Sequence, residues 1–391
     1  MNILFLFYAP MVPYIGGIQR VSENLAKELK ARGHNVCYLC INRDDMDIDY
    51  DYPVTQYFLD ESLEKQAYIE SYLHFLKEHK TDVIISQEAR EDLLELLSQS
   101  PESVKTITCC HLQPFYTQGD TKTIIRYIKA KGIKAKLFKG FCTIFPSYYR
   151  NKILAEEREV MAQALDTSDR VCLLSERFIP RLEKYMPGVD ISRVIAVNNP
   201  NTFSGEHPLN EEKEKVVICV GRQSNSPKKI PLFIDFWTRF QPRHKGWKAF
   251  VIGTGVDLEY NKRYARRKHA EDLLFTGNVK DVSPYYDKAR FLVMPSSYEG
   301  WGMILTEAMS HGCIPCAFDT YESLHDIIDD GVNGIIEKPY DVKRLTERIE
   351  SLMADAAANK KMQQAAVEKS KSFTVEKIVD KWESILTELC K

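Results

Sequence analysis

The chain has no apolar run of roughly eighteen residues, the length that a helix needs to cross a bilayer. We therefore expect no membrane-spanning segment. An excess of charge of one sign is also missing, because 53 Lys and Arg residues stand against 55 Asp and Glu residues, for a net charge of −2. This balance does not favour nucleic acid as a partner.

A secretory signal is also missing from the first residues, MNILFLFYAPMVPY, which have neither a basic n-region nor a small-residue cleavage site. This stretch predicts a first core strand. The ten cysteines include two CxxC pairs, Cys37/Cys40 and Cys313/Cys316, but neither lies in a glycine-rich knuckle and no histidine spacing completes a zinc site. We expect buried, reduced thiols, which suit a cytoplasmic protein.

Short apolar runs recur along the chain, and most are separated by segments with helical periodicity. Non-alternating strands between helices are typical of parallel sheets covered on both faces. A polar stretch near 199–215 divides the runs into two series. The runs are 3–8, 36–41, 82–87, 105–110, 170–175 and 193–198, then 216–221, 249–255, 273–279, 291–296, 314–318 and 334–338.

Two such series predict an α/β protein with two doubly wound Rossmann-like domains facing each other across a cleft. The expected boundaries are 1–200 for the first domain and 201–372 for the second. A last helix, 373–391, is expected to pack back on the first domain, with a capping residue near Ser372–Thr374. Ligands bind such sheets at the carboxyl ends of the strands.

The stretch YEGWGMILTE follows one of these runs and places two carboxylates eight positions apart. Glu299 falls in a strand-to-helix loop, and Glu307 in the second turn of the helix, where a side chain leans back toward the loop. Gly300 and Gly302 leave the first N–H groups of the helix open to an anion. The simpler alternative is a glycine-rich loop followed by a glutamate near the positive end of the helix dipole.

Two further loops follow the first strand of each series. VGRQSNSPKK offers Arg222 and Lys228 to a diphosphate, with Lys229 as the competing lysine, unless the lysines are only solvated. In the first series, Gly16 and Gly17 open an amphipathic helix. They resemble a phosphate-binding loop without matching GxGxxG, and the alternative is a turn that requires positive φ.

In this order, the motifs resemble the retaining glycosyltransferases of family 4, which have the GT-B fold. The resemblance covers nearly the whole chain and is strongest over 216–340, where VGR–K, FTGNV, EGWGMILTEAMSHGCIP and DGVNGIIEKP follow one another. Three positions depart from the family pattern: Gln223 replaces the commoner Leu, KK replaces KG, and Cys316 replaces a small aliphatic residue.

The resemblance implies that 1–200 is the acceptor-side domain and that 201–372 is the nucleotide-sugar domain. It also implies a role for each site residue. Glu307 would bind the ribose diol of a nucleotide-sugar, and Glu299 would bind hydroxyls of the donor sugar. Arg222 and Lys228 would neutralise the diphosphate. Backbone N–H groups at Gly302 and Met303 would help to bind the diphosphate, and backbone near Val279 would contact the base. Gly16 and Gly17 are also implied to contact the donor. His111 would face the donor sugar, unless it is only structural.

The family mechanism implies retention by front-face attack, with no metal and no cofactor beyond the donor itself. Glu299 and Glu307 are therefore not expected to act as the paired carboxylates of a glycosidase. One segment indicates otherwise, because DDMDIDYDY at 44–52 contains DxD patterns that bind metal in the other major glycosyltransferase fold. An acidic run of this density is more often a solvated loop.

Residues 121–152 contain nine Lys or Arg residues, no Asp or Glu, and many interspersed apolar residues. This composition suits an anionic membrane surface or a lipid-phosphate acceptor, although a solvated helix pair would also fit. We thus expect a protein of the cytoplasmic face of the membrane.

Our leading hypothesis is a hexosyltransferase that uses a nucleotide-sugar, with UDP-sugar favoured, in surface polysaccharide or glycolipid synthesis. The acceptor would be a glycan or a lipid-linked saccharide. The rivals are a sugar-nucleotide epimerase or a phosphorylase on the same scaffold, and a catalytically silent protein that binds nucleotide. A phosphorylase would usually need a pyridoxal lysine, which no motif marks. The silent protein is disfavoured because the chain still has all four residues implied at the donor site, Glu299, Glu307, Arg222 and Lys228.

Overall fold

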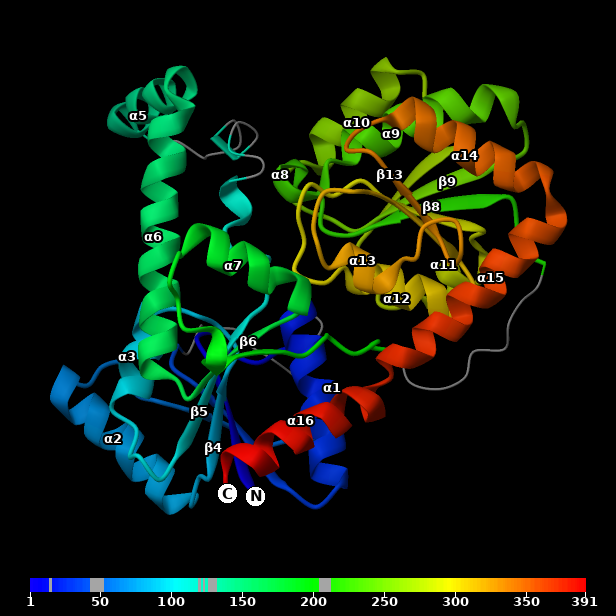
Figure 1. Ribbon diagram of the computed structural model, residues 1–391. Helices are drawn as coiled ribbons and strands as arrows, with labels where there is room; N and C mark the ends of the chain where they lie inside the picture. Colours follow the sequence, from blue (N-terminus) through cyan, green and yellow to red (C-terminus); the bar gives the residue numbers. More distant parts are fainter. Residues whose placement is uncertain (14–15, 43–52, 119–120, 122–123, 126–131, 204–211) are drawn as a thin grey trace. The chain divides into compact units, whose positions relative to one another are not determined.

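The computed structural model in Figure 1 describes residues 1–391 except 14–15, 43–52, 119–120, 122–123, 126–131 and 204–211. The chain divides into two compact units, and each is described by itself. The first unit comprises Met1–Phe115, Asn151–Thr202 and Thr374–Lys391. The second unit comprises Tyr116–Arg150 and Phe203–Phe373. The segment 116–150 therefore groups with the second unit, whereas the sequence boundaries placed it in the first domain.

The described strands of the first unit form one parallel sheet with the order β3-β2-β1-β4-β5-β6-β7. All six apolar runs of the first series are strands of this sheet, to within a few residues at their ends. The strand β3 was missed because its three residues, QYF, are too few to form an apolar run. The strands are β1 (Asn2–Phe7), β2 (Asn35–Cys40), β3 (Gln56–Phe58), β4 (Val83–Ser86), β5 (Lys105–Cys110), β6 (Arg170–Leu173) and β7 (Val194–Ala196).

Amphipathic helices accompany these strands, as the predicted βαβ pattern requires. The helix α1 begins after Gly16 and buries Val21, Leu25 and Leu29 along one face. The helices are α1 (Gly17–Ala31), α2 (Lys65–Glu78), α3 (Glu91–Ser98), α6 (Pro146–Thr167), α7 (Ile179–Tyr185) and α16 (Val375–Leu389), with short 3-10 turns at Glu176–Phe178 and Ile191–Arg193. The first residues of α6, up to Arg150, belong to the second unit.

The carboxyl-terminal helix α16 packs on α1 within the first unit. Thr374 caps it, because its side chain accepts a hydrogen bond from the backbone N–H of Lys377; the predicted capping position is thus confirmed. Arg32 lies 2.6 Å from carboxylate oxygens of both Asp380 and Glu383. The hydrogen bonds from His34 and Arg32 hold the pKa of Glu383 below its usual value.

The described strands of the second unit form a parallel sheet with the order β10-β9-β8-β11-β12-β13. When the strands of each sheet are renumbered from one along the chain, this order is 3-2-1-4-5-6, which is also the order of the first six strands of the other sheet. The strands are β8 (Val216–Val220), β9 (Lys248–Ile252), β10 (Leu273–Gly277), β11 (Phe291–Met294), β12 (Ile314–Phe318) and β13 (Ile335–Glu337). All six runs of the second series are thereby confirmed as strands.

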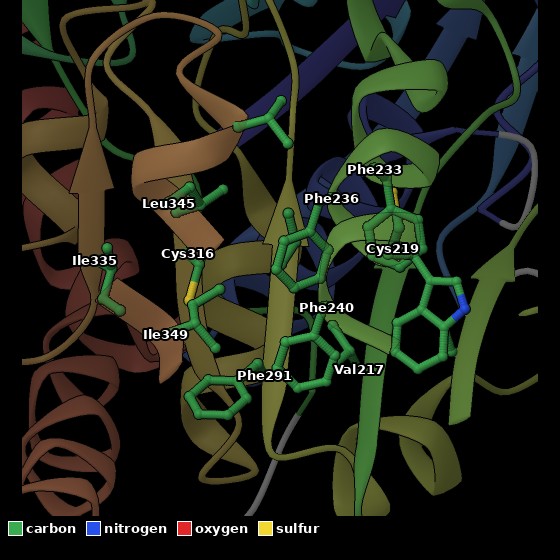
Figure 2. Packing of buried hydrophobic residues seen from close by; sticks show 14 of the residues in the cluster. Val217, Cys219, Phe233, Phe236, Phe240, Phe291, Cys316, Ile335, Leu345 and Ile349 are labelled. Carbon is green, nitrogen blue, oxygen red and sulfur yellow. The ribbon is translucent and has the colours of Figure 1, made fainter. Parts of the chain in front are cut away.

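One hydrophobic cluster stabilises the second sheet (Figure 2). The helix α9 places Phe233, Phe236 and Phe240 against strand residues such as Val217 and Phe291, all completely buried. Each such side chain contributes roughly 1.5–3 kcal/mol through burial. The helices of the unit are α5 (Ile133–Ile144), α8 (Asn225–Lys228), α9 (Ile230–Phe240), α10 (Leu258–Arg267), α11 (Ser283–Lys288), α12 (Met303–Ser310), α13 (Leu324–Ile327), α14 (Val342–Ala354) and α15 (Ala356–Ser370), with 3-10 turns at Tyr116–Gln118, Gln241–Arg243 and Lys371–Phe373.

The cysteines of both CxxC pairs are free thiols in strands or at strand ends. Cys40, Cys313 and Cys316 are buried, as predicted, while Cys37 is only partly buried. Burial raises the pKa of Cys40 and of Cys313 to about 12, so both are protonated and unsuited to bind metal at neutral pH. Within the described ranges, no helix is long and apolar enough to cross a membrane.

Candidate active site

An ion pair connects two of the predicted site residues, Lys228 and Glu299. Glu299 lies in the loop between β11 and α12, and Lys228 is the last residue of α8, which follows β8. The Lys228 Nζ lies 2.5 Å from Glu299 Oε1, and the two side chains are only 20% and 15% exposed. The fold thus brings together two residues 71 positions apart. Because water is largely excluded, their attraction is stronger than that of a surface pair.

The neighbouring lysine has a different environment. Lys229 takes a left-handed conformation, with φ of 43°, at the start of α9. Its Nζ lies 5.3 Å from the centre of the Tyr340 ring. Of the two lysines that the sequence offered, Lys228 is therefore the one beside Glu299.

The start of α12 requires glycine for two separate reasons. Gly302 has φ of 91° and ψ of 48°, a left-handed conformation that other residues adopt at a cost. A Cβ at this position would also lie 2.8 Å from the hydroxyl of Tyr321. No side chain in the described part of the chain caps the helix, so Met303 begins a turn whose N–H groups can meet an anion.

Glu307 lies in the second turn of α12, as the sequence predicted, but it is deeply buried. Its residue surface is 2% exposed, and the hydroxyl of Tyr286 on α11 donates a hydrogen bond to its Oε2 at 2.9 Å. A carboxylate held by a buried donor keeps one orientation, since a hydrogen bond to a charged group contributes roughly 1.5–3 kcal/mol.

The loop that carries Arg222 and Lys228 is fixed by buried amide groups. Arg222 is exposed, whereas Gln223 is completely buried and accepts a hydrogen bond from Asn261 at 2.7 Å. Asn225 in turn donates to Asn261 at 2.8 Å. This network explains why position 223 departs from the family pattern, because a leucine there would leave the Asn261 amide without the acceptor that Gln223 provides.

Two glycines of the next loop allow it to approach this one. A Cβ at Gly253 would overlap the carbonyl oxygen of Gly221, and one at Gly255 would lie 2.6 Å from the carbonyl oxygen of Gln223. Both glycines have positive φ. The loops after β8 and β9 therefore pack backbone against backbone, which leaves the Arg222 loop little freedom to move.

His111 lies in the first unit, directly after β5. Its Nε2 is 3.0 Å from Gln87 Oε1, and Gln87 Oε1 is in turn 2.9 Å from Ser22 Oγ on α1. Since an amide oxygen only accepts, Nε2 carries the proton of the neutral ring and Nδ1 is left as an acceptor. Nδ1 is buried without a partner in the described structure, and burial lowers the pKa of His111 to about 4. The imidazole is therefore neutral at pH 7.

Gly16 and Gly17 also lie in the first unit, at the start of α1. Gly16 is extended, with φ of −156°, so the alternative of a turn that needs positive φ is wrong. A Cβ at Gly16 would meet only the flexible side chain of Gln19, at 2.6 Å. Glycine is thus not required here by the backbone.

The remaining predictions concern the base and a metal. Val279 follows β10 and is partly buried. The acidic segment 44–52 lies entirely within 43–52, outside the described residues. Elsewhere in the described chain, no group of three or more His, Cys, Asp or Glu side chains is arranged to hold a metal ion.

Two family models match the chain in succession. The model described as "Glycosyltransferase Family 4" matches residues 15–200, and "Glycosyl transferases group 1" matches residues 202–369. The chain belongs to the family 4 glycosyltransferases. The resemblance drawn from the motifs is thereby confirmed.

Relatives of this glycosyltransferase are distant. An "uncharacterized glycosyltransferase" of Haemophilus influenzae is 21% identical over 97% of this chain and 99% of its own length. The amylovoran biosynthesis glycosyltransferase AmsD of Erwinia amylovora is 29% identical over 50% of this chain and 56% of its own length. The crystal structure of a S. aureus TarM variant with Fondaparinux, α-GlcNAc-glycerol and UDP has a TM-score of 0.75 at 12% identity, covering 99% of this chain and 100% of that one. That likeness shows the fold, a two-domain GT-B architecture.

The structure of this glycosyltransferase adds polar groups to which the motifs gave no role. Three buried polar atoms near the Glu299 loop have no hydrogen-bond partner in the described structure: Ser296 Oγ, Trp301 Nε1 and Tyr321 OH. Burial, with a contribution from the charge of Glu299, raises the pKa of Tyr321 well above its usual value. Such atoms usually bind water or a ligand, because an unpaired buried polar group costs about 1–3 kcal/mol.

Together, the second unit places a shielded ammonium, an exposed guanidinium and an uncapped helix start at the carboxyl ends of neighbouring strands. These groups can bind a diphosphate. The carboxylates of Glu299 and Glu307 can accept hydrogen bonds from hydroxyls. The loops after β8 and β11, together with α12, can therefore bind a ligand that carries both phosphates and sugars.

Proposed function

We propose that this glycosyltransferase transfers a hexose from a nucleotide-sugar to a glycan or a lipid-linked saccharide, with retention of anomeric configuration and without a metal. The observation that carries the proposal is the ion pair between Lys228 and Glu299, in the loops beside the uncapped start of α12. The ammonium of Lys228 suits a phosphate and the carboxylate of Glu299 suits a sugar hydroxyl, so a single ligand with both groups fits the pair.

Each site residue has a proposed role in this reaction. Lys228 and Arg222 neutralise the diphosphate, helped by N–H groups at Gly302 and Met303. Glu299 accepts hydrogen bonds from the donor sugar, and Glu307, oriented by Tyr286, binds the ribose diol. The backbone near Val279 meets the base, while His111, Gly16 and Gly17 of the first unit complete the donor contacts.

In the proposed step, the bond between the anomeric carbon and the phosphate oxygen breaks with both electrons leaving on the phosphate. An acceptor hydroxyl forms the new bond on the same face, and its proton passes to the leaving phosphate oxygen. Fixed positive charge and N–H groups stabilise the developing phosphate charge, and one lost donor of this kind costs about 2.7–4 kcal/mol.

UDP is the favoured nucleotide, and the TarM structure with UDP supports this choice. The name of AmsD, a glycosyltransferase of amylovoran biosynthesis, supports a role in surface polysaccharide or glycolipid synthesis. We further propose that the protein acts at the cytoplasmic face of the membrane.

The decisive experiment is thermal melting of the wild type with UDP, GDP and ADP. A ligand at a hundred times its dissociation constant stabilises the folded state by about 2.7 kcal/mol. We expect UDP to raise the melting temperature and Glu307→Gln to abolish the rise, since the amide keeps an acceptor for Tyr286 but loses the charge. Glu347→Gln, at a partly exposed carboxylate on α14, is the matched control and should retain the rise. If none of the three nucleotides shifts the melting temperature, the proposal fails.

Transfer itself has two further readouts. Proton NMR of the product should show the same anomeric configuration as the donor, and an inverted product would exclude retention. Activity should survive extensive dialysis against a chelator. Loss of activity that is restored by a divalent cation would exclude the metal-independent step.

A further inference from the structure

The helix α5 exposes an unusual set of large apolar side chains. Ile133, Leu137 and Ile144 are 78%, 69% and 72% exposed, and Phe141 is 44% exposed. Single exposed apolar residues are normal on protein surfaces, but a contiguous group marks an interaction site. Figure 1 shows α5 beside the amino-terminal end of α6, to which it is joined through Phe145.

The apolar side chains form a stripe that faces away from the protein. With 3.6 residues per turn, Ile133, Ile144, Leu137 and Phe141 fall within roughly 80° of the helix circumference. Cys142 is the buried residue of α5, and it lies roughly 140° from the centre of that stripe. In α9, by contrast, the apolar face is the buried one. The orientation of α5 is therefore that of a helix whose partner lies outside the chain.

Aromatic rings extend the stripe beyond the end of α5. The Phe141 ring lies 5.1 Å from that of Phe145 and 5.2 Å from that of Tyr148. Phe145 and Tyr148 are themselves 54% and 51% exposed. Aromatic side chains with a polar tip, such as Tyr148, favour the boundary between water and lipid.

Positive charge borders the stripe on both sides. Lys134 and Lys136 flank it around the helix, Lys139 lies farther round, and Arg150 and Lys152 follow at the start of α6. The segment 121–152 contains no acidic residue. An apolar stripe flanked by lysines is the pattern of a helix that lies in an anionic lipid surface, where each basic residue increases binding about fivefold.

We propose that α5 binds an anionic bilayer, lying parallel to its surface with the stripe of Ile133, Leu137, Phe141 and Ile144 in the acyl boundary and the lysines among the headgroups. At 12 residues, α5 is too short to span the bilayer. The inference concerns how this protein reaches a membrane, and it does not depend on which donor or acceptor the enzyme uses.

The test is co-flotation of the full chain with phosphatidylcholine vesicles, with and without phosphatidylglycerol. We expect binding only to the anionic vesicles, and weaker binding as salt is raised. The double variant Leu137→Ser/Ile144→Ser should lower the partition coefficient at least a hundredfold, since each side chain contributes at least tenfold through burial. Lys134→Gln/Lys136→Gln should lower it about 25-fold.

Matched controls come from exposed residues elsewhere in the chain. Val256→Ser/Val332→Ser removes two apolar side chains that are 68% and 58% exposed. Lys245→Gln/Lys343→Gln removes two exposed charges. Both control variants should float like the wild type, and a loss as large as that of the α5 variants would overturn the assignment to α5.

A fluorescence measurement reports insertion directly. The four native tryptophans, Trp237, Trp247, Trp301 and Trp382, are all buried. In Phe141→Trp, emission should therefore shift to the blue with anionic vesicles and be quenched by brominated lipid. An unshifted emission would overturn the proposal. A wild type that ignores vesicles but forms a dimer, when Leu137→Ser/Ile144→Ser stays monomeric, would also overturn it, in favour of a second copy of the chain.

Discussion

The two units share one strand order but differ in the chemistry at the carboxyl ends of their strands. In the second unit, Lys228, Glu299 and Glu307 bring charge to the loops after β8 and β11 and to α12. In the first unit, β4 corresponds to β11 and β5 to β12. The loops after them hold Gln87 and a neutral His111, and the charged residues there, Glu88 and Arg90, form an ion pair at 3.8 Å. The comparison teaches that a doubly wound sheet provides the location of a site, while a few loop residues decide whether it can bind a charged ligand.

The largest expected effect comes from removing a positive charge from the candidate active site of the second unit. Lys228→Met should lower the rate of glycosyl transfer by about 10²–10³, because a group that stabilises the leaving phosphate is lost. Steady-state kinetics with a UDP-sugar would measure it. Lys229→Gln is the matched control and should change the rate only severalfold. Equal losses in both variants would show that Lys228 has no special role.

The two glycine-led helix starts should respond differently to alanine. Gly302→Ala should lower the free energy of unfolding by about 2 kcal/mol, because φ is positive and the new Cβ would lie 2.8 Å from the hydroxyl of Tyr321. Gly16→Ala should change it by less than about 0.5 kcal/mol, since only the Gln19 side chain must move. Urea denaturation measures both.

A double variant separates the two costs at Gly302. Gly302→Ala/Tyr321→Phe removes the hydroxyl that the new Cβ would meet but keeps the backbone strain. It should therefore be more stable than the sum of the two single changes predicts. Strict additivity would assign the whole cost to the backbone.

The orienting hydrogen bond on Glu307 should have a smaller effect. Tyr286→Phe removes the donor to Glu307 Oε2 and should weaken nucleotide binding about tenfold, the equivalent of a hydrogen bond to a charged group. Calorimetric titration with UDP measures the affinity. The adjacent variant Tyr285→Phe, on the same helix α11, should bind like the wild type, and a similar loss there would attribute the effect to the packing of α11.

The neutral histidine of the first unit should have its effect only in acid. Burial lowers the pKa of His111 to about 4, whereas in the unfolded chain it is about 6.5. Between these values the unfolded chain binds a proton that the folded chain does not, so His111 lowers the free energy of unfolding as pH falls from about 6.5 to about 4. His111→Gln should lose this part of the pH dependence. The exposed His74→Gln should keep it, and identical curves for wild type and His111→Gln would contradict the buried, neutral state.

Much of the fold could be predicted because buried parallel strands are continuous apolar runs. The runs at 105–110 and 314–318 match β5 and β12 to the residue. The strand β3 escaped because three residues carry no periodicity. The positions of Glu299 and Glu307, in a loop and in the second turn of a helix, followed from local spacing alone.

The supporting residues could not be predicted, since they reach the site across long stretches of sequence. Tyr321 meets Gly302, and Asn261 bonds Gln223 from 38 positions away. No local pattern marks such partners, and their identity depends on which strand ends lie side by side. The choice between Lys228 and Lys229 was open for the same reason, because it depends on side-chain direction after the turn at Lys229.

The placement of α16 has a consequence for synthesis of the protein. The first unit is completed by residues from the far end of the chain, and Arg32 finds Asp380 across 348 positions. While the ribosome is still translating the second unit, the exposed flank of α1 has no cover. Cotranslational folding of the first unit therefore stays incomplete until α16 has emerged, and a nascent chain paused before that point presents an apolar surface to chaperones.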